Sequence, residues 1–183
     1  MIRPAVTSDA KQVAPLILLA LGNLAGKFAN SEDKAVQLEL FERFIALDGN
    51  QYSYKNILVW DDGGVCGMVM AYDGALLDNL RQPFLQYTRT NLGFTGQPED
   101  ETQAGELYID CLAVDPGQQG KGIAKKLLNA LIDKAKKSDM PAVGLLVDKE
   151  NNKAKQLYES IGFKVQGEKT LLGGIHYHLQ YSL

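Results

Sequence analysis

The stretch VDPGQQGKGIA, residues 114–124, joins a predicted strand to a predicted helix through a glycine-rich turn. The N-terminus of a helix exposes unpaired backbone N–H groups and carries a partial positive charge. Three small residues, Gly120, Gly122 and Ala124, leave the backbone of this turn open to close approach by a ligand. Such a turn is suited to binding a pyrophosphate group.

Two familiar phosphate-binding motifs do not describe this turn. A Walker P-loop requires a glycine, four residues and then Gly-Lys-Ser/Thr, and residues 114–124 lack that order. A dinucleotide fingerprint requires three spaced glycines after an early strand, with an acidic residue further on. A turn that merely connects a strand to a helix stays open as the simpler interpretation of these residues.

Downstream of the turn, strands and helices alternate. The predicted elements around and after it are a strand over residues 106–114, a helix over 124–137, a strand over 142–147, a helix over 152–161, and strands over 163–167 and 175–181. The last two strands are separated by a loop that contains Gly173 and Gly174. Leucines at helical spacing face inward from residues 124–137, and the lysines of this helix face outward.

Upstream, the pattern predicts a strand, two helices and a hairpin. Residues 2–6 form the strand, and the first helix has apolar residues at helical spacing and is interrupted at Gly22 and Gly26. The side chains expected to cap its start are Thr7, Ser8 and Asp9. The second helix begins at Ser31, and residues 34–47 carry its apolar face. The hairpin strands cover residues 56–60 and 65–72, with the turn Asp61-Asp62-Gly63-Gly64 between them.

Residues 74–105 do not continue the sheet pattern. They predict a helix that is interrupted near Pro83, followed by a polar segment over residues 95–104. A segment of this length between strands is usually functional or disordered. We interpret it as an insertion over one end of the sheet, within one α+β domain that spans residues 1–183.

Composition narrows the function classes. The 183 residues are 45% apolar and 22% charged, as in ordinary globular proteins, and the net charge of −3 provides no basic field for nucleic acid. The sequence shows no apolar run long enough to span a bilayer and no signal-peptide pattern at its start, so we expect no membrane partner and a cytoplasmic location.

The cysteines and histidines do not predict redox or metal chemistry. Cys66 and Cys111 lie in apolar runs and are too few for a disulfide framework. His176 and His178 alternate in a predicted strand, without a third ligand nearby. We therefore expect no metal site.

A family resemblance rests on two motifs. Residues 119–124 match Gln/Arg-x-x-Gly-x-Gly/Ala at each fixed position, after the strand end Leu112-Ala113-Val114-Asp115-Pro116. About thirty residues further on, residues 151–163 match Asn-x-x-Ala-x-x-Leu-Tyr-Glu-x-x-Gly-Phe. With these motifs, which together span residues 106–163, the sequence resembles the GNAT superfamily of N-acetyltransferases.

The resemblance implies both a fold and a co-substrate. The implied fold is a central mixed, mostly antiparallel twisted sheet of about seven strands flanked by helices, with strands four and five splayed apart. The implied co-substrate is acetyl-coenzyme A, with its pantetheine arm in the splay against the backbone near Leu112 and Val114. Its pyrophosphate would lie on the N–H groups of residues 119–124. The implied cofactor-binding residues are Leu112, Ala113, Val114, Gln119, Gly120, Lys121, Gly122, Ile123, Ala124, Asn151 and Tyr158.

Some of these roles have a physical rationale and some stay open. An extended pantetheine carries amides and can pair with an unpaired strand edge. Tyr158, which the resemblance places near the cofactor sulfur, is a candidate general acid for the leaving thiolate; the alternative is a core tyrosine. Lys121 either pairs with a phosphate or is simply solvated.

The acceptor must lose a proton before it attacks the thioester. Glu106, Tyr108 and Asp110 share one face of their predicted strand, because side chains alternate along a strand. Asp110 and Glu106 are therefore the candidate bases. An ordinary aspartate is a weak base, so Asp110 would act through water or need a raised pKa. The alternative for Asp110 is a hydrogen bond across the sheet.

The acceptor itself is not identified by these motifs. We expect a small-molecule or peptide amine, received by residues 22–56 and 74–104, where aromatic and acidic side chains suit a cation. The side chains in question are Tyr52, Tyr54, Asp73 and Asp78. By analogy with relatives that pair through their last strands, residues 176–181 are a candidate homodimer edge. A non-catalytic acyl-CoA sensor and a protein-interaction module that uses the insertion remain alternative functions.

Overall fold

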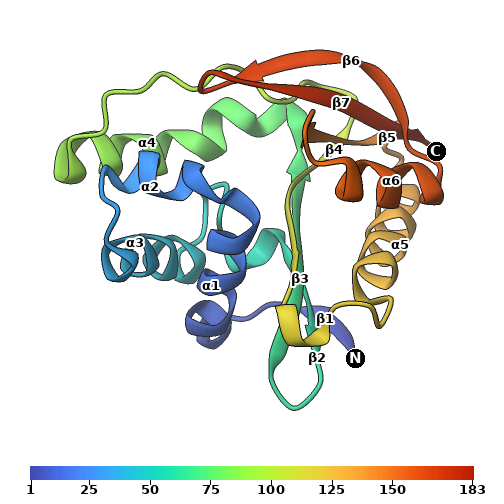
Figure 1. Ribbon diagram of the computed structural model, residues 1–183, viewed down its shortest axis with the longest axis horizontal. Helices are drawn as coiled ribbons and strands as arrows, with labels where there is room; N and C mark the ends of the chain where they lie inside the picture. The colour runs from blue at the N-terminus through green and yellow to red at the C-terminus, as the bar shows by residue number, and fades with distance from the viewer.

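A computed structural model describes residues 1–183, and its seven strands form one mixed sheet with helices on both faces (Figure 1). The strands are β1 (Ile2–Pro4), β2 (Ile57–Asp61), β3 (Val65–Asp73), β4 (Leu107–Val114), β5 (Ala142–Asp148), β6 (Lys164–Leu171) and β7 (Gly174–Ser182). The helices are α1 (Ala10–Leu21), α2 (Asn23–Ala29), α3 (Lys34–Ala46), α4 (Leu77–Leu92), α5 (Ile123–Lys137) and α6 (Asn152–Ile161). The strand order is β1-β2-β3-β4-β5-β7-β6.

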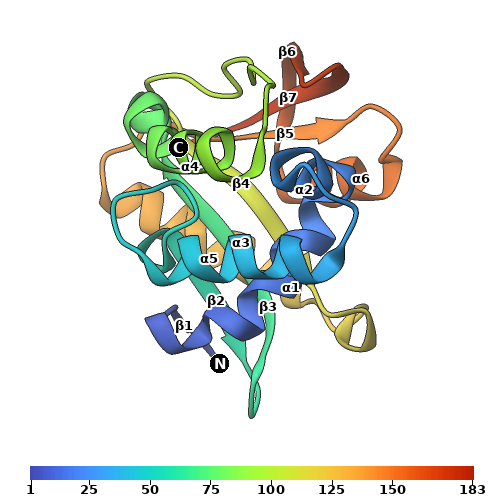
Figure 2. The same cartoon turned by 90° about the vertical axis from the view of Figure 1, so that its left-hand side faces the viewer.

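Two apolar cores lie on opposite faces of this sheet. Helices α1 to α4 cover one face, and α5 and α6 cover the other (Figures 1 and 2). Met68 and Met70 of β3 belong to the first core and Val69 to the second, as expected for alternating side chains. Leu127, Leu128 and the other inward residues of α5 are buried in the second core, which confirms the predicted amphipathic helix.

The only parallel contact in the sheet joins β4 to β5, and it is short. It runs from Leu107 paired with Val143 to Ile109 paired with Leu145, and beyond these residues the two strands no longer pair. All other neighbours are antiparallel. The expected α+β fold, with a mostly antiparallel sheet and splayed fourth and fifth strands, is therefore confirmed.

A bulge in β4 adds a feature that simple alternation did not predict. Met70 of β3 pairs with Cys111 and Ala71 pairs with Ile109, so Asp110 has no partner opposite it. Ile109 packs in the core beneath α5, whereas Cys111 packs in the core beneath α1. The bulge thus brings the adjacent side chains of Asp110 and Cys111 to the same face.

The paired end of β4 and β5 is fastened by Glu106, directly before β4. Its buried carboxylate accepts hydrogen bonds from Thr102 Oγ1 at 2.6 Å, His178 Nε2 at 2.9 Å and Gln180 Nε2 at 2.7 Å. His178 and Gln180 belong to β7, on the far side of β5. The side chain crosses β5 over Gly144, where a Cβ atom would overlap the carboxylate.

Several local expectations were wrong. Asp9 does not cap α1; its carboxylate binds Arg3 and the N–H of Val6. Helix α4 continues through Pro83, because Phe84 and Leu85 directly after it are buried in the core and hold this turn in place. Gly26 lies inside α2 rather than between helices.

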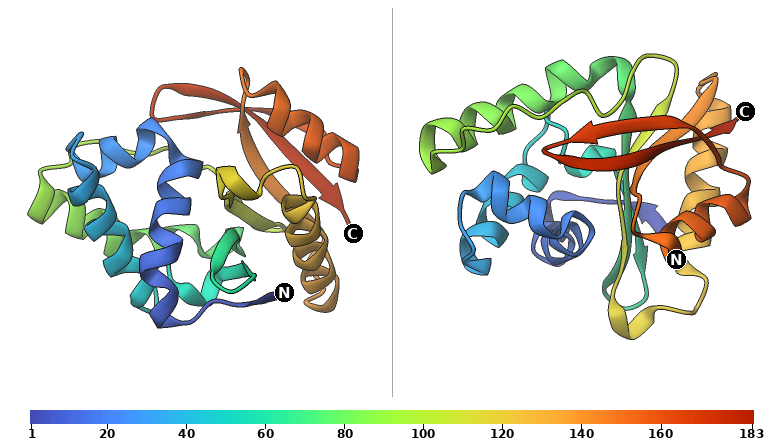
Figure 3. Two further views of the ribbon diagram at one scale, coloured as in Figure 1. Left: turned by 60° about the horizontal axis from the view of Figure 1, so that its bottom comes forward. Right: turned by 45° about the horizontal axis from the view of Figure 1, so that its top comes forward.

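The C-terminal hairpin also differs from expectation. Strand β6 extends to Leu171, so only Leu172 and Gly173 connect it to β7. The hairpin runs at a steep angle to β3 and β4 (Figure 3). Because β7 pairs with β5 on one side and with β6 on the other, the predicted dimer edge at residues 176–181 is wrong; β6 is the edge strand.

No helix alone has the length and apolar character required to cross a bilayer. Taken together, the segments Thr7–Leu21 and Asn23–Ala29 meet these criteria, but they are bent by 111°.

The crossing over β5 predicts that Gly144→Ala destabilises the protein. The added methyl group has no space beside Glu106, so we expect the free energy of unfolding to fall by about 1–3 kcal/mol. Urea denaturation measures this change. The matched control is Gly167→Ala in β6, where an added Cβ meets no atom within 4 Å. Equal stability of the two variants would contradict the close packing of the Glu106 carboxylate over Gly144.

Candidate active site

The glycine-rich turn presents open backbone donors. Gly120 and Gly122 have φ values of +79° and +74°, which favour glycine, and a Cβ at either position would meet nothing within 4 Å. No side chain caps α5 at Gly122, and the N–H of Lys126 donates to the Gly122 carbonyl at 3.1 Å. This is the first hydrogen bond of the helix, so the N–H groups of residues 123–125 have no partner within it and can bind an anion.

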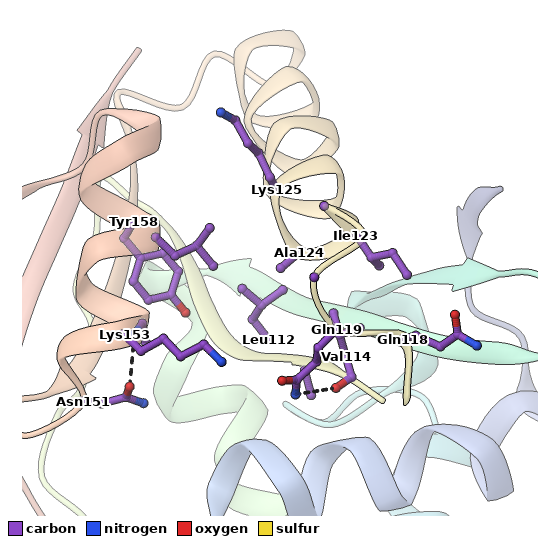
Figure 4. A pocket seen from close by; sticks show the side chains of 15 residues that line it. Leu112, Val114, Gln118, Gln119, Ile123, Ala124, Lys125, Asn151, Lys153 and Tyr158 are labelled. Atoms are coloured by element: carbon purple, nitrogen blue, oxygen red, sulfur yellow. Dashed lines mark hydrogen bonds between the residues drawn. The ribbon is translucent and has the colours of Figure 1, made fainter. Parts of the chain in front are cut away.

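This turn forms one wall of a cavity of about 540 Å³ (Figure 4). The residues that line it are Leu112, Ala113, Val114, Gln118, Gln119, Gly120, Gly122, Ile123, Ala124, Lys125, Asn151, Lys153, Ala154, Leu157 and Tyr158. All the predicted cofactor-binding residues are among them except Lys121, whose Nζ binds Gln118 Oε1 at 2.6 Å on the surface. We refer to this space as the donor cavity.

Sequence reasoning missed two lysines in the donor cavity. Lys125 lies in the first turn of α5 and Lys153 in the first turn of α6. Both line the donor cavity, Lys125 from α5 and Lys153 from α6, and add positive charge to it. Lys153 lies at a position where the second motif allows any residue, so the motif did not identify it as a cofactor-binding residue.

The first turn of α6 positions Tyr158. Asn151 caps this helix, and its side chain accepts from the N–H of Ala154 at 3.1 Å. Tyr158 follows seven residues later on the same side of the helix, with its ring against Phe163 and its hydroxyl pointing into the cavity (Figure 4). Burial, and to a smaller extent the neighbouring Cys111, raises the pKa of this hydroxyl, so Tyr158 keeps its proton at neutral pH.

A second cavity of about 540 Å³ opens on the other side of the splay, and we refer to it as the acceptor cavity. It lies between residues 110–112 of β4 and residues 146–148 of β5, and it is closed by residues 19–24 and by the tip of the β6–β7 hairpin. The two cavities share Leu112, Asn151, Ala154 and Tyr158. Tyr158 is therefore accessible from both sides.

Asp110 lies in the acceptor cavity, as a candidate base should. Its carboxylate accepts from Gln51 Nε2 and from the Tyr72 hydroxyl, each at 2.9 Å, and from Cys111 Sγ at 3.4 Å. Burial raises the pKa of Asp110 in spite of these donors. The hydrogen bond across the sheet, considered above as an alternative, is thus present.

Glu101 lies in the same cavity and was missed by sequence reasoning. It comes from the segment between α4 and β4, and the Tyr108 hydroxyl donates to its Oε2 at 3.2 Å. Burial, together with the nearby charge of Asp110, raises the pKa of Glu101 to about 8. Nothing in the sequence distinguishes Glu101 from the adjacent Glu99 and Asp100, whose side chains are exposed at the surface.

Glu106, the other predicted base, lies in neither cavity. Burial by itself would raise the pKa of its carboxylate, but the hydrogen bonds from His178, Gln180 and Thr102 outweigh that effect and lower it. A sealed carboxylate with a low pKa is a poor proton acceptor. Its contacts indicate that Glu106 stabilises the fold.

The side chains proposed for cation binding are not brought together at the acceptor cavity. Tyr52 is buried against Phe84, and Tyr54 lies in the turn before β2. Asp73 accepts from the N–H of Ala75, and Asp78 pairs with Arg81. From the segments expected to form this pocket, residues 22–24, Lys27 and Glu101 do line the cavity.

Residues 24–163 match the acetyltransferase (GNAT) family. The chain belongs to the GNAT family. Ribosomal protein bS18-alanine N-acetyltransferase of Haemophilus ducreyi is 36% identical over 96 residues, which are 49% of this chain and 63% of that protein. Mycothiol acetyltransferase of Beutenbergia cavernae is 38% identical over 63 residues, which are 34% of this chain and 20% of that protein.

A solved structure described as an acetyltransferase resembles this GNAT chain over its whole length. It has a TM-score of 0.82 and 30% sequence identity, and the match covers 100% of this chain and 98% of that one. Because the match covers 100% of this chain, it includes residues 74–105 and the C-terminal hairpin, which lie outside the two motifs.

The Glu106 cluster predicts an acid-dependent loss of stability. Because the pKa of Glu106 is lowered in the folded state, its contribution is complete above its ordinary value of 4.5 and is lost as pH falls through the folded value. Glu106→Gln should lower the free energy of unfolding at pH 7 by about 1.5–3 kcal/mol. The difference from the unsubstituted protein should shrink below pH 4.5.

Urea denaturation at several pH values measures both effects. Glu168→Gln, which removes a half-exposed carboxylate paired with Lys149 on the surface, is the control and should change stability little. A difference for Glu106→Gln that stays constant between pH 7 and pH 3 would contradict the ionised cluster.

Proposed function

We propose that this GNAT protein transfers an acetyl group from acetyl-CoA to a primary amine, by direct attack while both substrates are bound. The observation that carries the proposal is the junction of the two cavities at the splay beside Tyr158. A donor and an acceptor entering from opposite sides can meet there, and acetyl-CoA supplies the thioester that gives up the acetyl group.

The donor cavity has the groups that a coenzyme A molecule requires. Free N–H groups at the start of α5 suit a diphosphate, and Lys125 and Lys153 add positive charge. The edge of β4 beyond Ile109 no longer pairs with β5, so its backbone is available to the amides of an extended pantetheine. The open space above Gly120 and Gly122 leaves room for phosphate oxygens.

Tyr158 is the proposed proton donor to the leaving thiolate. Its hydroxyl faces the cavity and its pKa is raised, so the proton is held until a stronger base forms beside it. Because the proposed donor and acceptor sites share this residue, no covalent acetyl-enzyme is needed.

The acceptor class is an amine, carried by a small molecule or a peptide. The named relatives are a ribosomal protein bS18-alanine N-acetyltransferase and a mycothiol acetyltransferase, and each match covers at most about half of this chain. We also propose that residues 1–183 act as one cytoplasmic domain, in which the insertion at 74–105 contributes a wall of the acceptor site.

Release of the coenzyme A thiol from acetyl-CoA, screened over a diverse panel of amines, tests the function. We expect turnover with a subset of the panel and calorimetric binding of coenzyme A. Binding without thiol release on any amine would identify a non-catalytic sensor. Absence of binding at millimolar coenzyme A would reject the donor site itself.

Gly122→Val should weaken coenzyme A binding at least about 10-fold, which corresponds to about 1.4 kcal/mol. The valine side chain would occupy the open space over the backbone donors. Calorimetry measures the dissociation constant. Gly63→Val is the matched control, because Gly63 has a φ of +77° and open surroundings in the β2–β3 turn, so it carries the same backbone strain away from the cavity. Equal loss in both variants would contradict the phosphate site.

Tyr158→Phe should lower kcat by roughly 10²-fold and leave coenzyme A affinity within about 2-fold, because it removes the proton donor and keeps the ring. Steady-state kinetics and calorimetry provide the two numbers. Tyr177→Phe in β7, whose ring contacts Lys149 and Lys155 outside both cavities, is the control and should keep normal turnover. An unchanged kcat for Tyr158→Phe would remove Tyr158 from the acid role.

A further inference from the structure

We propose that Glu101, a residue of the insertion, is the base that removes the proton from the ammonium group of the acceptor. The inference rests on the proposed function and adds to it the second proton-transfer residue. It places the two catalytic residues on different parts of the chain: Tyr158 on α6, within the family motif, and Glu101 in the segment between α4 and β4.

The position of Glu101 suits a group that meets the acceptor. It lines the acceptor cavity together with Tyr158, so the proposed base and the proposed acid border the same space in which the amine would bind. Its carboxylate accepts from the Tyr108 hydroxyl and takes no part in fastening the segment. One carboxylate oxygen thus has no side-chain partner at hydrogen-bond distance and can accept from an ammonium group.

Neighbours on both sides of Glu101 fasten the segment. Asp100 pairs with Arg81 of α4 at 2.7 Å, and Thr102 donates to Glu106 at 2.6 Å. Further back, the Glu99 carboxylate accepts from the N–H of Leu172 at the tip of the β6–β7 hairpin, at 2.7 Å. Glu101 is therefore held in place by a fixed backbone, as a pre-organised catalytic group requires.

Asp110 is less suited to this step because its oxygens are already occupied. Gln51 and Tyr72 both donate to its Oδ2, and Cys111 lies against its Oδ1. Through these contacts Asp110 holds Tyr72 and places a negative charge beside Glu101. We assign Asp110 a positioning role and Glu101 the proton transfer.

The charged and titratable groups around Glu101 keep it a usable base. Those that face it are Tyr72 of β3, Arg81 of α4, and Tyr108 and Asp110 of β4, while Lys27, Asp148, Tyr158 and His176 line the other walls of the cavity. Burial and Asp110 bring the pKa of Glu101 to about 8, closer to the value of about 10.4 for an alkylammonium than an ordinary carboxyl is. A smaller difference between these two pKa values lowers the free-energy cost of moving the proton from the ammonium group to Glu101.

A small cavity behind Glu101, mostly apolar but with four polar or charged side chains in its wall, offers a route for the proton to leave. Its volume is about 20 Å³, enough for one water molecule, and Gln51, Arg81, Glu101 and Asp110 are in its wall. Arg81 Nε is buried and has no hydrogen-bond partner in the protein. A water molecule there would accept from Arg81 Nε and link the two carboxylates.

The proton balance is complete. The N–H bond of the ammonium breaks and its proton goes to the Glu101 carboxylate, which leaves a neutral amine. The amine nitrogen then forms the amide bond as the carbon–sulfur bond breaks, and Tyr158 gives its proton to the sulfur. The second proton lost by the nitrogen restores Tyr158. Glu101 releases its proton to solvent, so the net products are the amide, the free thiol and one proton.

Glu101→Gln tests the assignment with the best amine from the thiol-release screen. We expect kcat/KM to fall by about 10²-fold or more, while calorimetric coenzyme A affinity and the melting temperature stay unchanged. In the unsubstituted protein kcat/KM should rise with pH up to about pH 8, where Glu101 becomes a carboxylate, and Glu101→Gln should lose this step. Glu168→Gln, at the surface of β6 and outside both cavities, is the control and should retain the step.

A second acceptor separates proton transfer from structure. A weakly basic amine such as methoxyamine is already neutral at assay pH and needs no base. Its turnover should fall by less than about 3-fold in Glu101→Gln if the lost function is deprotonation. Equal losses with both amines, or an unchanged pH profile, would overturn the role of Glu101 and leave the transferase activity standing. Failure of the unsubstituted protein with every amine would instead reject the proposed function.

Discussion

The separation of β4 from β5 after Ile109 is the constraint on which the other features of the site depend. While the strands pair, they form an ordinary parallel ladder; once they diverge, one edge of β4 has free backbone groups and an opening forms through the sheet. Glu106 fixes the place where this happens, because it ties β4 to β7 across Gly144 at the closed end. Without that fastening the position of the opening would be poorly defined.

The opening explains why helices from both faces contribute to one site. Helices α5 and α6 bring the free N–H groups and Tyr158 to one side, whereas the α1–α2 junction and the insertion bring the acceptor walls to the other. The bulge at Asp110 belongs to the same arrangement. It turns Asp110 and Cys111 to the acceptor side while Leu112 remains between the two cavities. In the proposed reaction the two substrates therefore approach from opposite faces of the sheet and meet at the opening.

Sequence reasoning succeeded where chemistry is local. The turn at residues 119–124 and the pair Asn151 and Tyr158 are each set by a few consecutive residues on one element, and they line one cavity as expected. It failed where the environment comes from elsewhere in the fold. Pro83 was expected to break a helix whose packing through Phe84 preserves it, and the last strand was expected at an edge that β6 covers.

Glu101 and Glu106 show the same limit in electrostatic terms. They are identical residues five positions apart, yet their pKa values shift in opposite directions. Glu106 has hydrogen-bond donors on every side, two of them from β7, so its charged form is stabilised. Burial penalises the charged form of Glu101, the facing carboxylate of Asp110 adds to this effect, and the hydrogen bond from Tyr108 offsets only part of it. Two of the three donors of Glu106, His178 and Gln180, are more than seventy residues away in the chain, and only folding brings them close. Alternation along β4 could therefore identify the face of the strand but could not tell which carboxylate holds the sheet together and which is left free to take a proton.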